Sequence, residues 1–180
     1  MKKILITKSK NRSRDLAEFL AKNNYQIFYQ SLFSIQKKIP KELASPSNHF
    51  KKPVTIILSS ANSIYILEKL KVNKNSNIYV ISNQTAKKLK KIGYKNIFYP
   101  DNLSGKDLFN LIIKKINPCE IFYFHGEKIS FDFKTNLEKL AYKVNSYKVY
   151  KTCEINFFSK NLLENIKIHN IDEILIFSLN

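Results

Sequence analysis

The chain has 180 residues, of which 31 are Lys or Arg and 14 are Asp or Glu, so its formal net charge is +17 at pH 7. With 44% hydrophobic and 13% aromatic residues it can bury a core, which excludes a disordered tail. The three Gly and five Pro exclude collagen-like and flexible-linker proteins, and the two Cys exclude a disulfide framework.

Short apolar runs alternate with amphipathic stretches along the whole chain, the βαβα pattern of parallel sheets covered by helices. The runs at 4–6, 56–58 and 174–177 lack polar alternation, as expected of strands buried on both faces. In chain order, the predicted strands cover residues 3–7, 25–29, 54–59, 78–82, 97–99, 120–124, 146–150 and 173–178.

Six helices are predicted between these strands. The first covers 14–22, and the fourth is the best marked, because Ser104 and Asp107 resemble a capping box and Asn117-Pro118 ends it. The other four are indicated by apolar residues at helical spacing, which are Ile64, Leu67 and Leu70; Ala86, Leu89 and Ile92; Leu137, Leu140 and Ala141; and Leu162, Leu163 and Ile166.

Residues 36–53 contain Pro40, Pro46 and Pro53 and have no apolar period, which predicts a linker or a boundary loop. A second crossing is expected near 150–154. We therefore predict a discontinuous first lobe of residues 1–36 and 151–180 and a second lobe of residues 39–149. Residues 174–178 read as a central strand, yet the sequence stops two residues later, so we expect a thin first-lobe sheet with an open edge.

The apolar stretch at 4–6 is too short for a secretory signal, and no apolar run reaches the roughly 18 residues of a membrane-spanning helix. We expect a soluble protein with no membrane partner in a reducing, cytoplasmic compartment. The excess of lysine has two explanations. The first is that A+T-rich codons, which favour Lys, Asn and Ile, produced the excess. The second is that the ligand is a polyanion, either nucleic acid or a small polycarboxylate.

Ligands of open parallel sheets bind beyond the carboxyl ends of the strands. The residues expected there are small, hydroxylic or amidic, which suits carboxylates or phosphates, although each also reads as an ordinary helix cap. They are Thr7, Lys8 and Ser9; Ser59, Ser60, Ala61 and Asn62; Ser82, Asn83, Gln84 and Thr85; His125, Gly126, Glu127 and Lys128; and Ser178.

Other motifs point away from metals and nucleotides. His49, His125 and His169 share no ligand spacing with Cys119 or Cys153, so no metal site is expected. The sequence has no Gly-rich phosphate loop. Tyr150 lies where the chain returns to the first lobe, a position that allows its hydroxyl to face the cleft.

Seven segments follow one another in a recognisable order: Ile4-Leu5-Ile6-Thr7-Lys8-Ser9, Ser31-Leu32-Phe33-Ser34-Ile35, Leu58-Ser59-Ser60-Ala61-Asn62, Ser82-Asn83-Gln84-Thr85-Ala86, His125-Gly126-Glu127, Val149-Tyr150-Lys151-Thr152 and Ile176-Phe177-Ser178. Taken in this order, they resemble the uroporphyrinogen-III synthase family over essentially the whole chain.

The resemblance implies an α/β fold with two flavodoxin-like parallel-sheet lobes joined by a two-stranded connection, the first lobe being incomplete. It implies cofactor-free, metal-free cyclisation of hydroxymethylbilane with inversion of the last pyrrole ring. Tyr150 aligns with the family's cleft tyrosine and is the candidate for assisting hydroxyl departure. The implied substrate-binding residues are Thr7, Lys8, Ser9, Ser60, Ala61, Asn62, Asn83, Thr85, His125, Gly126 and Ser178.

The chain also departs from the family pattern. Lys8 and His125 stand where the family has Arg, Ser82 replaces a Gly, and the family continues beyond Ser178. These departures indicate a truncated member that has low solubility or assembles with a separate C-terminal fragment. The alternative is an inactive remnant that binds polyanions through charge. A nucleic-acid protein is a third possibility, but no recognition helix or interleaved basic and aromatic pattern is present, so nucleic acid is not expected.

Overall fold

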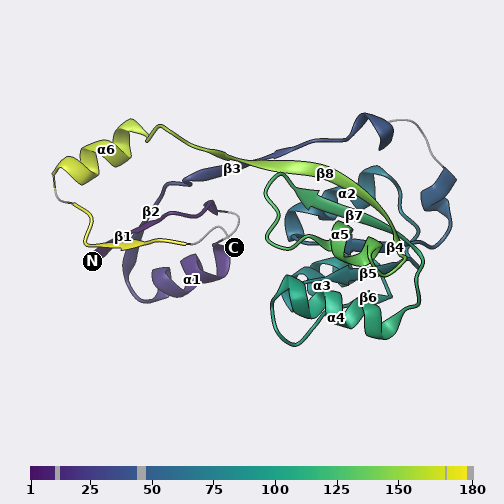
Figure 1. Ribbon diagram of the computed structural model, residues 1–180. Coiled ribbons are helices and arrows are strands. Elements are labelled where there is room, and N and C mark those ends of the chain that lie inside the picture. Colours follow the sequence, from purple (N-terminus) through teal and green to yellow (C-terminus); the bar gives the residue numbers. More distant parts are fainter. Residues whose placement is uncertain (11–12, 44–47, 169, 178–180) are drawn as a thin grey trace. The chain divides into compact units, whose positions relative to one another are not determined.

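The computed structural model describes residues 1–10, 13–43, 48–168 and 170–177, and the chain divides into two compact units. Unit 1 comprises Met1–Ser34 and Thr152–Asn180, and unit 2 comprises Ile35–Lys151. The elements of each unit are labelled in Figure 1. No helix in the described ranges is long and apolar enough to cross a membrane.

The elements alternate along the chain as the hydrophobic pattern predicts. The strands are β1 (Lys2–Ile6), β2 (Tyr25–Tyr29), β3 (Phe33–Lys37), β4 (Thr55–Leu58), β5 (Asn77–Val80), β6 (Ile97–Phe98), β7 (Glu120–Gly126), β8 (Lys143–Glu154) and β9 (Glu173–Leu175). The α-helices are α1 (Arg14–Lys22), α2 (Ile64–Lys69), α3 (Asn83–Lys91), α4 (Gly105–Lys115), α5 (Phe133–Glu138) and α6 (Lys160–Lys167), and the short 3₁₀ helices are η2 (Lys41–Leu43), η3 (Asn48–Lys51) and η4 (Ala61–Ser63).

Unit 2 is built on a sheet with the strand order β3-β8-β7-β4-β5-β6. Its central strand, β4, pairs in parallel with β5 and with β7. Ile56, Ile57 and Leu58 of β4 are fully buried, so both faces of this strand are covered. This confirms the prediction from its uninterrupted apolar run and the parallel α/β class.

The two faces of the sheet carry separate core clusters. The first core cluster comprises Leu43, Phe50, Ile56, Leu58, Ile66, Leu67, Val72, Ile78, Val80, Ala86, Leu89, Tyr94, Phe122, Phe124 and Val149, which places α2 and α3 on this face. The second core cluster comprises Ile57, Tyr79, Leu108, Ile112, Ile121, Tyr123, Phe133, Leu137, Tyr142 and Val144, which places α4 and α5 on the other.

The helix starts follow the predicted chemistry. The Oγ of Ser104 accepts the backbone N–H of Asp107 at 3.1 Å and caps α4. Ser159 caps α6 in the same way, through the backbone N–H of Leu162 at 3.3 Å.

The prediction of a linker at 36–53 is wrong for part of that segment. Strand β3 extends to Lys37, and two 3₁₀ helices follow. Leu43 and Phe50 are 7% and 2% exposed and belong to the first core cluster. Two isolated apolar residues create no period, so the hydrophobic pattern contains no sign that this segment packs on the sheet.

Strand β8 runs from Lys143 to Glu154, well beyond the predicted 146–150. It lies between β7 and β3 in the sheet. Its hydrogen bonds to β3 and its neighbours include Lys38 N–H to the Val149 carbonyl at 2.7 Å and Ile155 N–H to the Leu32 carbonyl at 2.9 Å. Because β8 is paired with a neighbour on each edge, it continues beyond the apolar residues from which its length was predicted.

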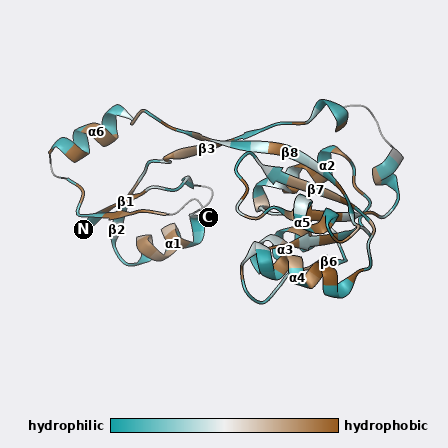
Figure 2. Ribbon diagram, viewed as in Figure 1, coloured by the Kyte–Doolittle hydropathy of each residue, from teal (hydrophilic) through white to brown (hydrophobic). Residues whose placement is uncertain are grey.

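Unit 1 has a three-stranded sheet with the order β2-β1-β9, in which both pairings are parallel. Ile4 and Ile6 pack against Leu20 of α1. In the described residues β9 ends at Leu175, earlier than the predicted 173–178, and Ile174 and Ile176 are 56% and 78% exposed. Figure 2 shows alternating hydrophilic and hydrophobic bands along α6, where Leu163 and Ile166 are also exposed.

Replacing Phe50 tests whether segment 36–53 belongs to the core of unit 2. The Phe50 ring lies edge-on against Phe122, with ring centroids 4.9 Å apart. Phe50→Ala should lower the free energy of unfolding by about 3–5 kcal/mol, because it leaves a cavity in a packed core. Chemical denaturation measures this loss. The exposed Lys52→Ala change should cost less than about 0.5 kcal/mol, and a similarly small loss for Phe50→Ala would contradict the docking.

Candidate functional site

The predicted site residues of unit 2 gather at one edge of its sheet. Strands β4, β5, β7 and β8 are parallel neighbours, so their carboxyl ends lie along the same edge. Register pairs Leu58 with Val80 and with Phe124, and Gly126 with Tyr150. The structure thus brings together Ser60, Ala61, Asn62, Asn83, Thr85, His125, Gly126 and Tyr150 along this edge, which we call the rim.

The hydroxyl residues of the rim act as caps. The Oγ of Ser60 accepts the backbone N–H of Asn62 at 3.2 Å, at the start of η4. Ser82 caps α3 through the backbone N–H of Thr85 at 3.3 Å, and the two hydroxyl oxygens are 2.9 Å apart. Thr85 is buried whereas Asn83 is exposed. The cap interpretation therefore accounts for the observed hydrogen bonds of Ser60 and Ser82.

His125 joins two strands at the rim. Its Nδ1 lies 2.6 Å from the carbonyl oxygen of Gly126, and its Nε2 lies 2.9 Å from the Oγ of Ser146 on β8. A carbonyl only accepts, so Nδ1 carries the proton, and in the neutral ring Nε2 accepts from the Ser146 hydroxyl. Sequence reasoning missed Ser146, which it placed only as part of a strand.

Burial is the main influence on the charge of this histidine. It lowers the pKa of His125 from the ordinary value of 6.5, and the positive charge of Lys148 lowers it further, while the hydrogen bond to Gly126 acts in the opposite direction. The ring lies against Tyr123, with centroids 4.6 Å apart. Burial also raises the pKa of Tyr123 to about 12. Both rings are therefore uncharged at neutral pH.

Tyr150 lies directly on Gly126. A Cβ added to Gly126 would come within 2.5 Å of the Tyr150 Cζ and 2.8 Å of its hydroxyl oxygen, so a larger residue at 126 would displace this ring. Tyr150 is half-buried and packs against the first core cluster.

The predicted site residues of unit 1 follow strand β1. Thr7 donates its hydroxyl to the Leu175 carbonyl at 2.9 Å and accepts the Phe177 N–H at 3.3 Å. The Lys8 Nζ lies 5.0 Å from the centroid of the Phe177 ring. Ser9 is half-buried, and its carbonyl accepts the Ser13 hydroxyl at 3.0 Å. Ser178 lies outside the described residues.

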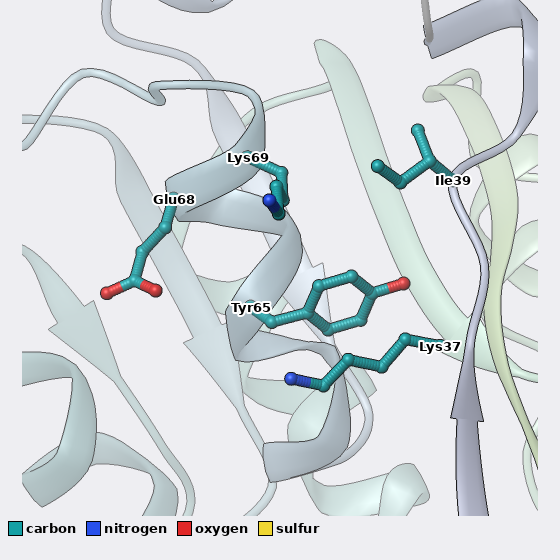
Figure 3. Close-up of a pocket in the computed structure, with 5 residues that line it drawn as sticks. All are labelled: Lys37, Ile39, Tyr65, Glu68 and Lys69. Carbon is teal, nitrogen blue, oxygen red and sulfur yellow. The ribbon is translucent and has the colours of Figure 1, made fainter.

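A separate pocket of about 440 Å³ lies between α2 and the segment that contains β3 (Figure 3). Its lining residues are Lys37, Ile39, Tyr65, Glu68 and Lys69. The Lys37 Nζ is 4.7 Å from the centre of the Tyr65 ring. The Tyr65 hydroxyl is bonded to the backbone of Lys38 and Val149. Sequence reasoning missed Tyr65 as well, because tyrosine on an amphipathic helix reads as packing.

Unit 2 also contains a long stretch of sequence without acidic residues. Residues 69–100 contain no Asp or Glu, and all their lysines are exposed. These lysines are Lys69, Lys71, Lys74, Lys87, Lys88, Lys90, Lys91 and Lys95. This surface attracts anions, and salt weakens that attraction. Across the described ranges, no three His, Cys, Asp or Glu side chains are grouped as metal ligands.

Comparisons with known proteins agree on one family. The family model described as uroporphyrinogen-III synthase HemD matches residues 15–179. A search of curated protein sequences finds no match. The solved uroporphyrinogen-III synthetase from Helicobacter pylori is 20% identical, with a TM-score of 0.54, and the alignment covers 89% of this chain and 66% of that one. A mutant uroporphyrinogen III synthase from Thermus thermophilus is 13% identical, with a TM-score of 0.57 and coverages of 97% and 71%.

At these identities the likeness to solved structures supports the fold, and the family match carries the assignment. The chain spans about two thirds of the length of the Helicobacter pylori structure.

The buried histidine predicts a pH dependence of stability. Because the folded chain lowers the pKa of His125 below 6.5, the unfolded chain binds more protons as the pH falls through 6.5. The free energy of unfolding should therefore fall on acidification from about pH 7.5 to 5.5, and less steeply in His125→Gln. Urea denaturation at several pH values measures both slopes. Equal slopes in the two proteins would contradict this assignment.

Proposed function

The chain belongs to the uroporphyrinogen-III synthase family, and on this premise we propose that it closes hydroxymethylbilane into a ring with inversion of the last pyrrole ring. The observation that carries the proposal is the family match over residues 15–179. The rim of unit 2 supports it, since the residues that resemble the family's motifs lie along one sheet edge.

The substrate fits the charge of the chain. The linear tetrapyrrole carries eight carboxylates, and the net charge of +17 favours such a ligand. We propose that both lobes, 1–36 with 151–180 and 39–149, contribute binding residues. Thr7, Lys8, Ser9 and Ser178 come from the first, and the rim residues from the second. The proposed compartment is the cytoplasm, in line with the low cysteine content.

In the proposed reaction, Tyr150 donates its phenolic proton to the substrate hydroxyl, which leaves as water. The azafulvene cation that remains is attacked within the same molecule through a spiro intermediate. Ring closure releases one proton, which returns to the Tyr150 phenolate, so no cofactor is invoked. The main contribution of the protein is to hold the chain in a folded conformation, because a positioned intramolecular attack is far faster than a random encounter. The half-buried position of Tyr150 beside Gly126 supports its role.

Turnover of hydroxymethylbilane tests the proposal. The wild-type chain should form the type III isomer faster than the type I isomer forms without catalyst. Tyr150→Phe should lower kcat about 100-fold, the usual contribution of a general acid. Tyr147→Phe is the matched control, because this residue lies on the same strand and stacks on Phe124. Type I product alone from the wild-type chain would refute the proposed activity.

A second candidate is an inactive member that binds polyanions. The acid-free lysine surface at 69–100 favours it.

The second candidate has its own signature. Uroporphyrin, a fluorescent octacarboxylate, should bind with an affinity that falls steeply as salt is added, because charge alone holds it. Lys87→Glu combined with Lys88→Glu should weaken this binding, while Lys139→Glu on the exposed surface after α5 serves as the control. Fluorescence titration measures both. Formation of type III product by the wild-type chain would exclude the inactive-member interpretation.

A further inference from the structure

The pairing of β7 with β8 contains a bulge next to Tyr150. His125 lies opposite Lys148, but Gly126 lies opposite Tyr150, so Val149 is the additional residue in β8. Consecutive residues of a regular strand point to opposite faces. Here Val149 is a member of the first core cluster and Tyr150 packs against the same cluster. The bulge therefore turns the Tyr150 side chain to the face that Val149 already occupies.

Gly126 provides the surface on which the ring lies. Its φ is not in the left-handed region, which among the glycines only Gly93 occupies. Glycine at 126 therefore matters because the Tyr150 ring approaches it closely. The atoms that a Cβ would meet are Cζ, Cε2 and the hydroxyl oxygen of Tyr150, so the reactive end of the side chain is the part in contact.

The backbone on both sides of the bulge is held by hydrogen bonds. The Val149 carbonyl accepts the Lys38 N–H at 2.7 Å, and the Tyr65 hydroxyl lies within hydrogen-bond distance of this carbonyl and of the Lys38 carbonyl, which is 2.7 Å away, so its one proton is shared between the two. The Tyr150 carbonyl accepts the Glu127 N–H at 3.0 Å. Figure 3 shows the Tyr65 hydroxyl pointing from α2 toward the segment that carries Lys37 and Ile39.

The opposite strand is held as well. The Gly126 carbonyl lies 2.6 Å from Nδ1 of His125, whose Nε2 is bonded to Ser146 two pairs earlier on β8. The peptide beneath the Tyr150 ring is thus tied to its own strand and, through the imidazole, to the neighbouring one.

We propose that Gly126 and Tyr65 are positioning residues for Tyr150. The bulge orients the phenol ring, Gly126 leaves room for the ring above it, and the Tyr65 hydroxyl holds the carbonyl of Val149, the additional residue. This inference rests on the proposed function, in which Tyr150 is the proton donor. It assigns to Gly126 a second role besides contact with substrate. It also gives Tyr65, which lies on α2, a role in the reaction.

Tyr65→Phe is the sharpest test, because it removes one hydroxyl and keeps the ring against Lys37 and the core. With the Tyr150 hydroxyl less well placed, kcat should fall between about 10- and 100-fold while KM stays unchanged. Tyr142→Phe is the matched control. It removes a hydroxyl bonded to the Ile116 carbonyl at 2.6 Å, on the second core cluster, and should leave kcat unchanged.

A readout that does not depend on turnover separates this inference from the proposed function. With 3-fluorotyrosine placed at position 150, the ¹⁹F spectrum of the otherwise wild-type chain should show one resonance. Tyr65→Phe and Gly126→Ala should shift or broaden it, whereas Tyr142→Phe should not. An unchanged resonance in folded Tyr65→Phe overturns the positioning role, whether or not the chain turns over substrate. Absence of type III product from the wild-type chain, with the resonance responding as expected, refutes only the proposed function.

Discussion

Burial of both faces of strand β4 is the constraint on which the rest of unit 2 depends. Ile56, Ile57 and Leu58 are completely enclosed, and an alternation of side chains sends them to opposite faces. A strand of this kind needs a parallel neighbour on each side and helices above and below. Once β5 and β7 lie beside β4, the segments that follow these strands begin at the same edge of the sheet. The rim is thus a consequence of core packing.

Much of the fold follows from the sequence, since apolar runs and helix caps are local signals. Ser104 and Ser159 begin their helices as expected. What local patterns miss are contacts made by single residues far apart in the chain. Phe50 is buried because Phe122 and Phe124 lie opposite it, and no residue pattern near position 50 predicts this burial.

The candidate site also has parts that local sequence signals predict and parts that depend on long-range contacts. The positions of Ser60, Thr85, His125 and Gly126 could be predicted, because the first two follow recognisable strands and the last two end one. The bulge beside Val149 could not be predicted, since the apolar pattern of β8 reads as a regular strand. The role of Tyr65 could not be predicted for a related reason. Its hydroxyl bonds to a backbone carbonyl 84 residues away, and every residue has such a carbonyl, so the sequence does not indicate which one is the partner.

The two units differ in how much apolar surface they enclose. In the described residues of unit 1, the buried cluster consists of Ile4, Ile6 and Leu20, whereas unit 2 has a core on each face of its sheet. Cooperative units with little buried surface open at lower free energy than those with much. Limited proteolysis should therefore digest unit 1 first and leave unit 2 as a resistant core fragment. Such a fragment would retain the bulge and Tyr150 but lose the hydrogen bonds of Thr7 to Leu175 and Phe177.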